Sequence, residues 1–174
     1  MLHASSGSGN ISISNLVFKN SPAAPPRDGG ALVFQGGYSV TLSGDTFTDN
    51  QTSGGGSGGA VAIETTASNA SVTLTNDTFT GNQTSGGGEG GAVEVRALAS
   101  GMTLDVERSS FSGNTTQSSG GGLDVFTVGG AVPTTLRDDT FSGNKIDGCG
   151  SSCELDGGGF SLINFTASTA AVTQ

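Results

Sequence analysis

Two 17-residue stretches of this chain are nearly identical, and they begin 32 residues apart. Residues 45–61 read DTFTDNQTSGGGSGGAV and residues 77–93 read DTFTGNQTSGGGEGGAV, so they differ only at Asp49/Gly81 and Ser57/Glu89. Self-similarity at a period of roughly 20–50 residues is typical of repeat architectures. The duplication therefore predicts a repeat protein.

A looser version of the same phrase continues on both sides of the duplication. One phenylalanine recurs in steps of 29, 32, 32 and 30 residues, at Phe18, Phe47, Phe79, Phe111 and Phe141. A Gly-Gly pair precedes an apolar run in each unit, at 29–30, 58–59, 90–91, 120–121 and 157–158. About five units of roughly 31 residues thus cover nearly the whole chain of 174 residues.

Within a unit, apolar residues alternate with polar or small ones. Val72-Thr73-Leu74-Thr75 and Val93-Glu94-Val95 show this period of two, which is typical of a β-strand with one buried face. The abundance of Gly, Thr, Ser and Val also disfavours helix. We therefore expect three short strands in each unit, and stacking of the units predicts an all-β parallel β-helix (β-solenoid).

Stacked coils place equivalent side chains above one another at about 4.8 Å, the spacing between strands. The expected structural ladder joins four aromatic rings to four amides that can hydrogen-bond along the axis: Phe47, Phe79, Phe111, Phe141, Asn50, Asn82, Asn114 and Asn144. A second inward column is expected from Ile11/Ile13, Val40/Leu42, Val72/Leu74, Met102/Leu104 and Leu136. A third is expected from Leu32/Phe34, Val61/Ile63, Val93/Val95, Leu123/Val125 and Phe160/Leu162.

The Phe-x-x-Asn and Gly-Gly-Ala-Val phrases resemble the paired short motifs of chlamydial polymorphic outer membrane proteins. They are similar also to the TFSGN…GGGI repeats of many bacterial surface proteins with a right-handed, pectin-lyase-like β-helix. The resemblance covers about Asn10 to Leu162. It implies a right-handed helix, export, and display as an autotransporter passenger, commonly in adhesion. The function expected from it is a non-catalytic structural or adhesive scaffold, extracellular or at the cell surface, whose partner is a host-cell surface, a matrix or a polysaccharide.

The ends of the chain raise a question of organisation. Residues 1–9 are polar and are expected to form a flexible leader, followed by a single β-helix domain over 10–174. Residues 2–10 offer no apolar core of a signal peptide, and no stretch has the length of a membrane span. The tail TASTAAVTQ resembles the start of another coil, and uncapped solenoids expose strand edges. We expect either a slice of a longer passenger or copies that stack end to end.

The candidate chemical groups are few. Asp45, Asp77 and Asp139 fall in one column, and Asp45 and Asp77 could share Ca²⁺, although hydrogen bonding to the backbone at a corner is the favoured reading. The six basic residues share no column, and the chain has no Trp and one Tyr. We therefore expect no enzyme, cofactor or metal site, with a polysaccharide-binding or degenerate pectin-lyase-like module as an alternative. A net charge of −9 opposes nucleic-acid binding.

Two cysteines, Cys149 and Cys153, lie in the segment KIDGCGSSCELDGGG, within the one unit whose spacing from Phe to Gly-Gly is expanded. Half of a metal site is the rival reading, but the sole histidine, His3, lies at the opposite end of the chain. A short local disulfide is the expectation for an exported protein.

The outward side chains beside the phenylalanines form the most regular exterior pattern. This candidate surface grid comprises Thr46, Thr48, Thr78, Thr80, Ser110, Ser112, Thr140 and Ser142. A second outward column is expected from Thr41, Thr73, Thr103 and Thr135. The grid resembles the ice-binding faces of β-solenoid antifreeze proteins, which makes ice binding another alternative. Against it, Asp105 and Arg137 are expected beside the grid, and Glu94 and Asp124 as solvated charges on another face.

Overall fold

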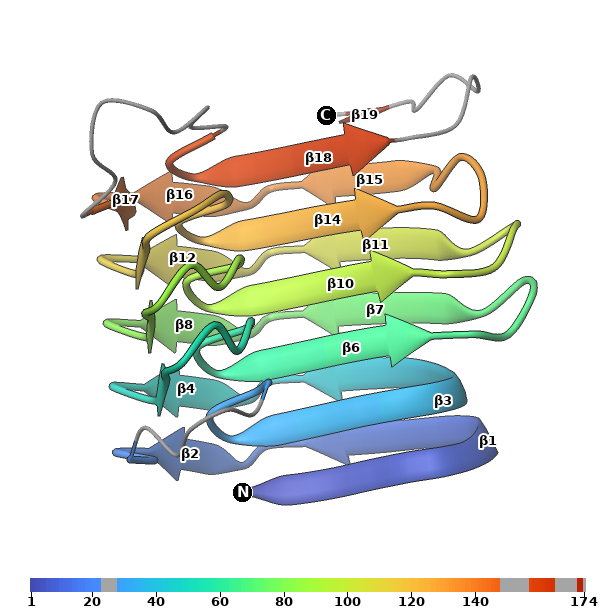
Figure 1. Cartoon of the computed structure of the whole chain (residues 1–174), viewed down its shortest axis with the longest axis horizontal. Helices are drawn as coiled ribbons and strands as arrows, with labels where there is room; N and C mark the ends of the chain where they lie inside the picture. Colours follow the sequence, from blue (N-terminus) through green and yellow to red (C-terminus); the bar gives the residue numbers. More distant parts are fainter. Residues whose placement is uncertain (23–27, 148–156, 165–171, 174) are drawn as a thin grey trace.

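The computed structural model describes residues 1–22, 28–147, 157–164 and 172–173 (Figure 1). Within these ranges the chain contains no helix and winds into a parallel β-solenoid of about five turns. Three parallel sheets run along the stack, which confirms the expected fold class with three strands to a coil.

The largest sheet has the order β18-β14-β10-β6-β3-β7-β11-β15-β19, with β1 beside β3. It forms two sides of the solenoid, because the long strands β1 and β3 continue from one side to the other (Figure 1). Its strands are β1 (Leu2–Ser14), β3 (Leu32–Ser43), β6 (Val61–Thr65), β7 (Ser71–Thr75), β10 (Val93–Ala97), β11 (Thr103–Glu107), β14 (Leu123–Thr127), β15 (Thr134–Arg137), β18 (Phe160–Asn164) and β19 (Val172–Thr173).

The other two sheets consist of very short strands. The five-stranded sheet contains β2 (Val17–Lys19), β4 (Thr46–Thr48), β8 (Thr78–Thr80), β12 (Ser110–Ser112) and β16 (Thr140–Ser142). The four-stranded sheet contains β5 (Gln51–Thr52), β9 (Gln83–Thr84), β13 (Thr115–Thr116) and β17 (Lys145–Ile146). Every pairing between consecutive coils in these sheets is parallel.

The Gly-Gly pairs make a sharp turn immediately before the strand that follows. Gly90 has a φ of 63°, and a Cβ there would lie 2.3 Å from the carbonyl oxygen of Val93. A Cβ on Gly91 would lie 2.1 Å from the carbonyl oxygen of Gly121 in the next coil. The first glycine is therefore required by backbone conformation, and the second by close approach of neighbouring coils.

The expected structural ladder is confirmed. Four consecutive pairs of rings, from Phe18 to Phe141, stack with centroids 4.7–5.0 Å apart and interplanar angles below 10°. The amide Nδ2 of Asn82 donates to Asn114 Oδ1 at 3.0 Å and to the carbonyl of Phe47 at 3.0 Å. Asn50 and Asn114 bond in the same way, so the amide ladder runs along the phenylalanine stack.

The expected second column is wrong by two residues in one coil. Val72 pairs with Leu104, and Leu74 pairs with Val106, so Met102 lies before the strand, where it is also buried. The outward column consequently contains Asp105, not Thr103, between Thr73 and Thr135. Spacing explains the register, because Val95 precedes Leu104 by the same nine residues that separate Ile63 from Val72. The third column is confirmed as expected.

The flexible leader expected for residues 1–9 is also wrong for most of its length. Residues 2–9 belong to β1, which pairs in parallel with β3 from Leu2 opposite Leu32 onward, with one irregularity between Ser5 and Gly7. Strand pairing uses backbone groups, so a polar segment can cover the edge of β3. Cys149 and Cys153 lie outside the described residues.

Candidate functional site

The eight residues of the candidate surface grid come together on the five-stranded sheet. Thr46, Thr78, Ser110 and Thr140 form one column in register, and Thr48, Thr80, Ser112 and Ser142 form the other. Thr78, Thr80, Thr140 and Ser142 are exposed, and the remaining four are half-buried. The hydroxyls of Thr80 and Ser112 lie 3.1 Å apart across two coils. The sheet therefore presents two stacked columns of hydroxyl groups.

Apolar and charged residues border the hydroxyl columns of the five-stranded sheet. In the first coil Val17 and Lys19 occupy the two columns, so no hydroxyl continues the grid there. Glu107 pairs with both Thr75 and Arg137, and it occupies the place expected for Asp105 in the later coils. Arg108 follows Glu107, and its guanidinium donates to Asn76 Oδ1 at 3.1 Å. Charged side chains thus flank a face that is only two hydroxyls wide.

The aspartate column consists of Asp45, Asp77 and Asp139. It lies at the corner between the side of the large sheet that contains β7 and β15 and the five-stranded sheet. Asp45 Oδ1 accepts from the Leu16 amide at 2.8 Å, and Oδ2 accepts from the Ser43 amide at 3.3 Å. Asp77 repeats this with the amides of Asp45 and Thr75 at 2.8 and 3.1 Å. Burial raises the pKa of Asp77 to about 7, against the opposing effect of these amides. The carboxylates bond to backbone at a corner, and no metal-binding group of three or more His, Cys, Asp or Glu occurs among the described residues.

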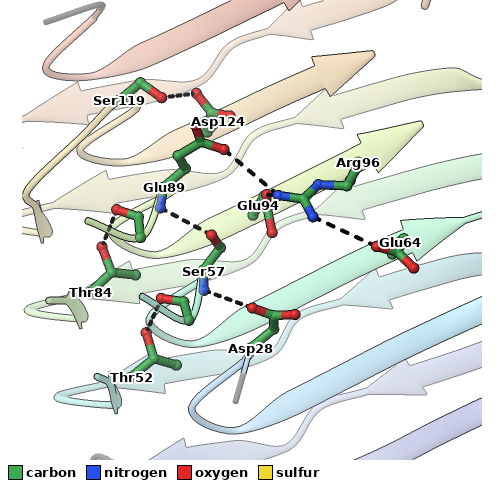
Figure 2. A network of polar contacts seen from close by, with 12 residues as sticks. Asp28, Thr52, Ser57, Glu64, Thr84, Glu89, Glu94, Arg96, Ser119 and Asp124 are labelled. Atoms are coloured by element: carbon green, nitrogen blue, oxygen red, sulfur yellow. Dashed lines mark hydrogen bonds and ion pairs between the residues drawn. The ribbon is translucent and has the colours of Figure 1, made fainter. Parts of the chain in front are cut away.

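A second polar cluster, which the alternation of residues did not predict, lies on β6, β10 and β14 and on the loop before β10 (Figure 2). Glu94 is 3% exposed and Asp124 is 0% exposed. Both were expected as solvated exterior charges, and this expectation is wrong. We call Glu64, Glu89, Glu94, Arg96 and Asp124 the carboxylate–arginine cluster.

The glycine-rich loops cover these carboxylates. Loops 53–60, 85–92 and 117–122 lead into β6, β10 and β14, and Ser119, the residue before one Gly pair, lies beside Asp124, five positions later (Figure 2). Ser119 Oγ accordingly donates to Asp124 Oδ1 at 2.8 Å. Hydrogen bonds also join successive loops, because the Glu89 amide donates to Ser57 Oγ and the Ser57 amide donates to Asp28 Oδ1. The loops therefore form a layer outside the sheet.

Arg96 neutralises part of the charge beneath this layer. Its guanidinium lies 2.9 Å from Glu94 Oε1, 3.7 Å from Glu64 Oε2 and 3.9 Å from Glu89 Oε2. The guanidinium carbon also lies 5.4 Å from the ring centroid of Phe126, the residue paired with Arg96 on β14. Burial lowers the pKa of Arg96, but Glu94, Glu89 and Glu64 outweigh it and hold the pKa above its usual value.

The buried carboxyls hold protons more tightly than ordinary ones. Burial raises the pKa of Glu94 to about 8; Arg96 opposes this, and Asp28, Glu89 and Asp124 add to it. Burial also raises the pKa of Asp124 to about 6. Such pKa values suit general acid–base chemistry, but side chains only 0–3% exposed offer little surface to a substrate. The geometry instead fits fastening of the loops onto the sheet.

A signal for this burial is present in the sequence. The column that holds Glu94 and Asp124 holds Val33 and Ala62 in the two preceding coils. An apolar residue on both faces of a strand indicates that both faces are covered. The outer cover could therefore have been inferred from Val33 and Ala62.

In the part of the chain that the structure describes, no helix is long and apolar enough to span a membrane. Comparisons with the models of known protein families, with curated proteins and with solved structures found no match to this chain.

Proposed function

We propose that the chain is a non-catalytic structural or adhesive scaffold, displayed at a bacterial surface and similar in role to the passengers whose repeats it resembles. The observation that carries the proposal is the pair of hydroxyl columns that stay in register over four coils. A repeated array of identical groups suits a repetitive partner, such as a polysaccharide or a glycan-coated host or matrix surface, because weak contacts add up by multivalency.

The core supports this role by holding the array rigid. Between the two outward hydroxyl residues of each coil lies an inward phenylalanine of the aromatic stack, and three residues after that phenylalanine comes an asparagine of the amide ladder. Phe47, Phe79 and Phe111 are 0% exposed. A hydroxyl attached to such a strand loses little further freedom when a partner binds, which favours adhesion through many small contacts.

Catalysis is not part of the proposal, and two observations favour leaving it out. The carboxyls with raised pKa values, Glu94 and Asp124, lie beneath the glycine-rich loops. The guanidinium of Arg96 lies within 4 Å of three carboxylates, so its charge is paired within the cluster.

An adhesion assay tests the proposal. Beads coated with the chain should bind immobilised bacterial, host or plant polysaccharides, and Thr78→Tyr together with Thr80→Tyr should reduce the binding at least about tenfold by blocking both columns. Thr73→Tyr is the matched control, since Thr73 faces outward on β7 of the neighbouring side. Equal binding by the grid variant and the control variant would contradict a role for the grid.

Ice binding is the second candidate, and the register of Thr46 with Thr78 and of Thr48 with Thr80 favours it. Such columns repeat at about 4.8 Å between coils and about 6.7 Å along a strand. The charges of Lys19, Glu107 and Arg108 beside the grid weigh against a flat ice-binding plane. We expect no thermal hysteresis from the purified chain, whereas faceted ice crystals that Thr78→Tyr abolishes would establish ice binding.

A further inference from the structure

Buried polar atoms without a hydrogen-bond partner occur in and beside the carboxylate–arginine cluster. Among the described residues they are Arg96 Nε, Asp124 Oδ2 and Ser161 Oγ. Asp124 is 0% exposed and Ser161 is 4% exposed. Buried polar atoms of native proteins are nearly always paired, so two unpaired oxygens at adjacent positions indicate a group that binds between them.

The two unpaired oxygens belong to neighbouring positions of one outward column. Asp124 on β14 pairs with Ser161 on β18 and, on its other side, with Glu94 on β10. Asp124 Oδ1 accepts from the Ser119 hydroxyl at 2.8 Å, which leaves Oδ2 to another partner. Ser161 Oγ lies near enough to Asp124 to oppose the rise in its pKa that burial causes, yet it completes no hydrogen bond with Oδ2. Two oxygens that face each other without sharing a proton are arranged like two ligands of one cation.

The charge around these oxygens also favours a cation. Burial is the main cause that raises the pKa of Asp124 to about 6, and the charge of Glu89 adds to it. At neutral pH the buried carboxylate is therefore mostly ionised. The guanidinium of Arg96 lies within 4 Å of the other three carboxylates of the cluster but forms no such pair with Asp124. A buried charge without an ion-pair partner among the described residues is costly unless a cation compensates it.

We propose that Asp124 Oδ2, Ser161 Oγ and the carboxylate of Glu89 bind one Ca²⁺ ion between the sheet and the layer of glycine-rich loops. Glu89 lies on the loop before β10, and its carboxylate faces Asp124 (Figure 2). All three groups are hard oxygen ligands, and the flexible coordination of Ca²⁺ suits an irregular set that water and loop carbonyls complete. The ion fastens the loop before β10 onto β14 and β18.

Two carboxylates and one hydroxyl make a weak site. It contains fewer acidic ligands than the groups of three or more, which do not occur among the described residues. Sites of low affinity bind Ca²⁺ with a Kd of about 0.1–1 mM. The side chain of Glu89 is 24% exposed, so an ion can enter from solvent. The hydroxyl columns lie on the five-stranded sheet, so the proposal concerns the loop layer and is independent of the adhesive role.

Calorimetric titration and thermal unfolding at constant ionic strength test the site. At about pH 7.5 the wild-type chain should bind one Ca²⁺, and about 10 mM CaCl₂ should raise the Tm by at least about 3 °C. MgCl₂ should raise it less, because Mg²⁺ requires a regular octahedron. At about pH 5 the Ca²⁺ effect should fall to less than about half, because protonated Asp124 is a poor ligand. A Tm that Ca²⁺ does not change, equal shifts with Mg²⁺, or an equal effect at both pH values would overturn the proposal.

Variants locate the ion. Asp124→Asn keeps the shape of the side chain and should raise the Kd for Ca²⁺ at least about tenfold, and Ser161→Ala should raise it about threefold. Glu64→Gln is the matched control, because it removes one carboxylate of the same cluster two coils from Asp124 and should leave the Kd within about twofold. Circular dichroism establishes that each variant is folded, and Ser161→Ala decides the matter if Asp124→Asn unfolds. Equal losses of affinity in the site variants and the control would show attraction by net charge alone and would contradict the site, as would an unchanged Kd in the site variants.

Discussion

The replacement Glu94→Gln should change how the stability of the solenoid depends on pH. Glutamine keeps the shape of the side chain and removes the group that titrates. The pKa of Glu94 is raised from 4.5 to about 8 by burial beneath the glycine-rich loops. The folded protein therefore holds a proton at this site that the unfolded chain releases above about pH 4.5.

The sign and the size of the effect follow from this difference. Stabilisation by the bound proton is complete below about pH 4.5 and is lost as the pH rises through about 8. A pKa difference of about 3.5, at about 1.4 kcal/mol for each pH unit, sets an upper limit near 5 kcal/mol for the loss. Asp124, whose pKa is raised to about 6, acts in the same direction at lower pH.

Urea unfolding monitored by circular dichroism from pH 5 to pH 9 measures the effect. Wild type should lose stability toward pH 9, and Glu94→Gln should lose less, so that the variant gains on wild type by up to several kcal/mol across the series. Glu64→Gln is the control, because it removes another carboxylate beside Arg96 from a half-exposed position and should keep the wild-type slope. If the unfolding free energy of Glu94→Gln minus that of wild type stays constant, or falls toward pH 9, the reasoning is refuted.

Three further predictions concern the ladder and the cysteines. Phe79→Ala should cost about 3–5 kcal/mol of unfolding free energy because its ring is 0% exposed between two stacked neighbours. Phe18→Ala, at the end of the stack, should cost less, and equal losses would contradict the ladder. Asn82→Ala should cost at least about 2 kcal/mol, since it leaves the Asn50 amide and the Phe47 carbonyl without their partner; hydrogen exchange at Asn50 as slow as in wild type would argue against this. Reduction of a Cys149–Cys153 disulfide should change the Tm little because the ring is short, and mass spectrometry that finds two free thiols after oxidative expression would disprove the pairing.

The parts of the fold that were predictable from sequence depend on two features that recur in every coil, the inward phenylalanine and the Gly-Gly pair, which we call anchors. Phe47 and Phe79 belong to nearly identical phrases, and the Gly-Gly pairs mark the start of β6, β10 and β14. The core requires the phenylalanine side chain, and the turn requires the backbone conformation of the glycines. The number of residues between successive phenylalanines or Gly-Gly pairs therefore gives the register of the coils directly.

The register error in β11 has a different origin. The turn from β10 to β11 lacks such an anchor, and Met102, Leu104 and Val106 are all apolar and all buried. A shift of one residue would exchange the two faces of a strand, but a shift of two leaves the alternation unchanged. Periodicity alone therefore could not distinguish Met102 from Leu104 as the partner of Val72.

The carboxylate–arginine cluster and β1 escaped prediction for other reasons. Alternation places Glu94 on the outer face of its strand, but it does not say whether a loop covers that face. The polar composition of residues 2–9 suggested a leader, although strand pairing there depends on the backbone edge of β3. The eight residues of the candidate grid lie in register on one sheet, because they flank the recurring phenylalanines.

The proposed hydroxyl face requires the coils to stack in the stated register, and one cross-link measures that register directly. In a chain with Cys149→Ser and Cys153→Ser, the pair Thr80→Cys and Ser112→Cys should form an intramolecular disulfide nearly completely, because their hydroxyls lie 3.1 Å apart in the wild type. The pair Thr80→Cys and Ser110→Cys is displaced by two residues along β12, about 8 Å between Cα atoms, and should not close. Efficient closure of the second pair, with failure of the first, would contradict the stacking on which the proposed function depends.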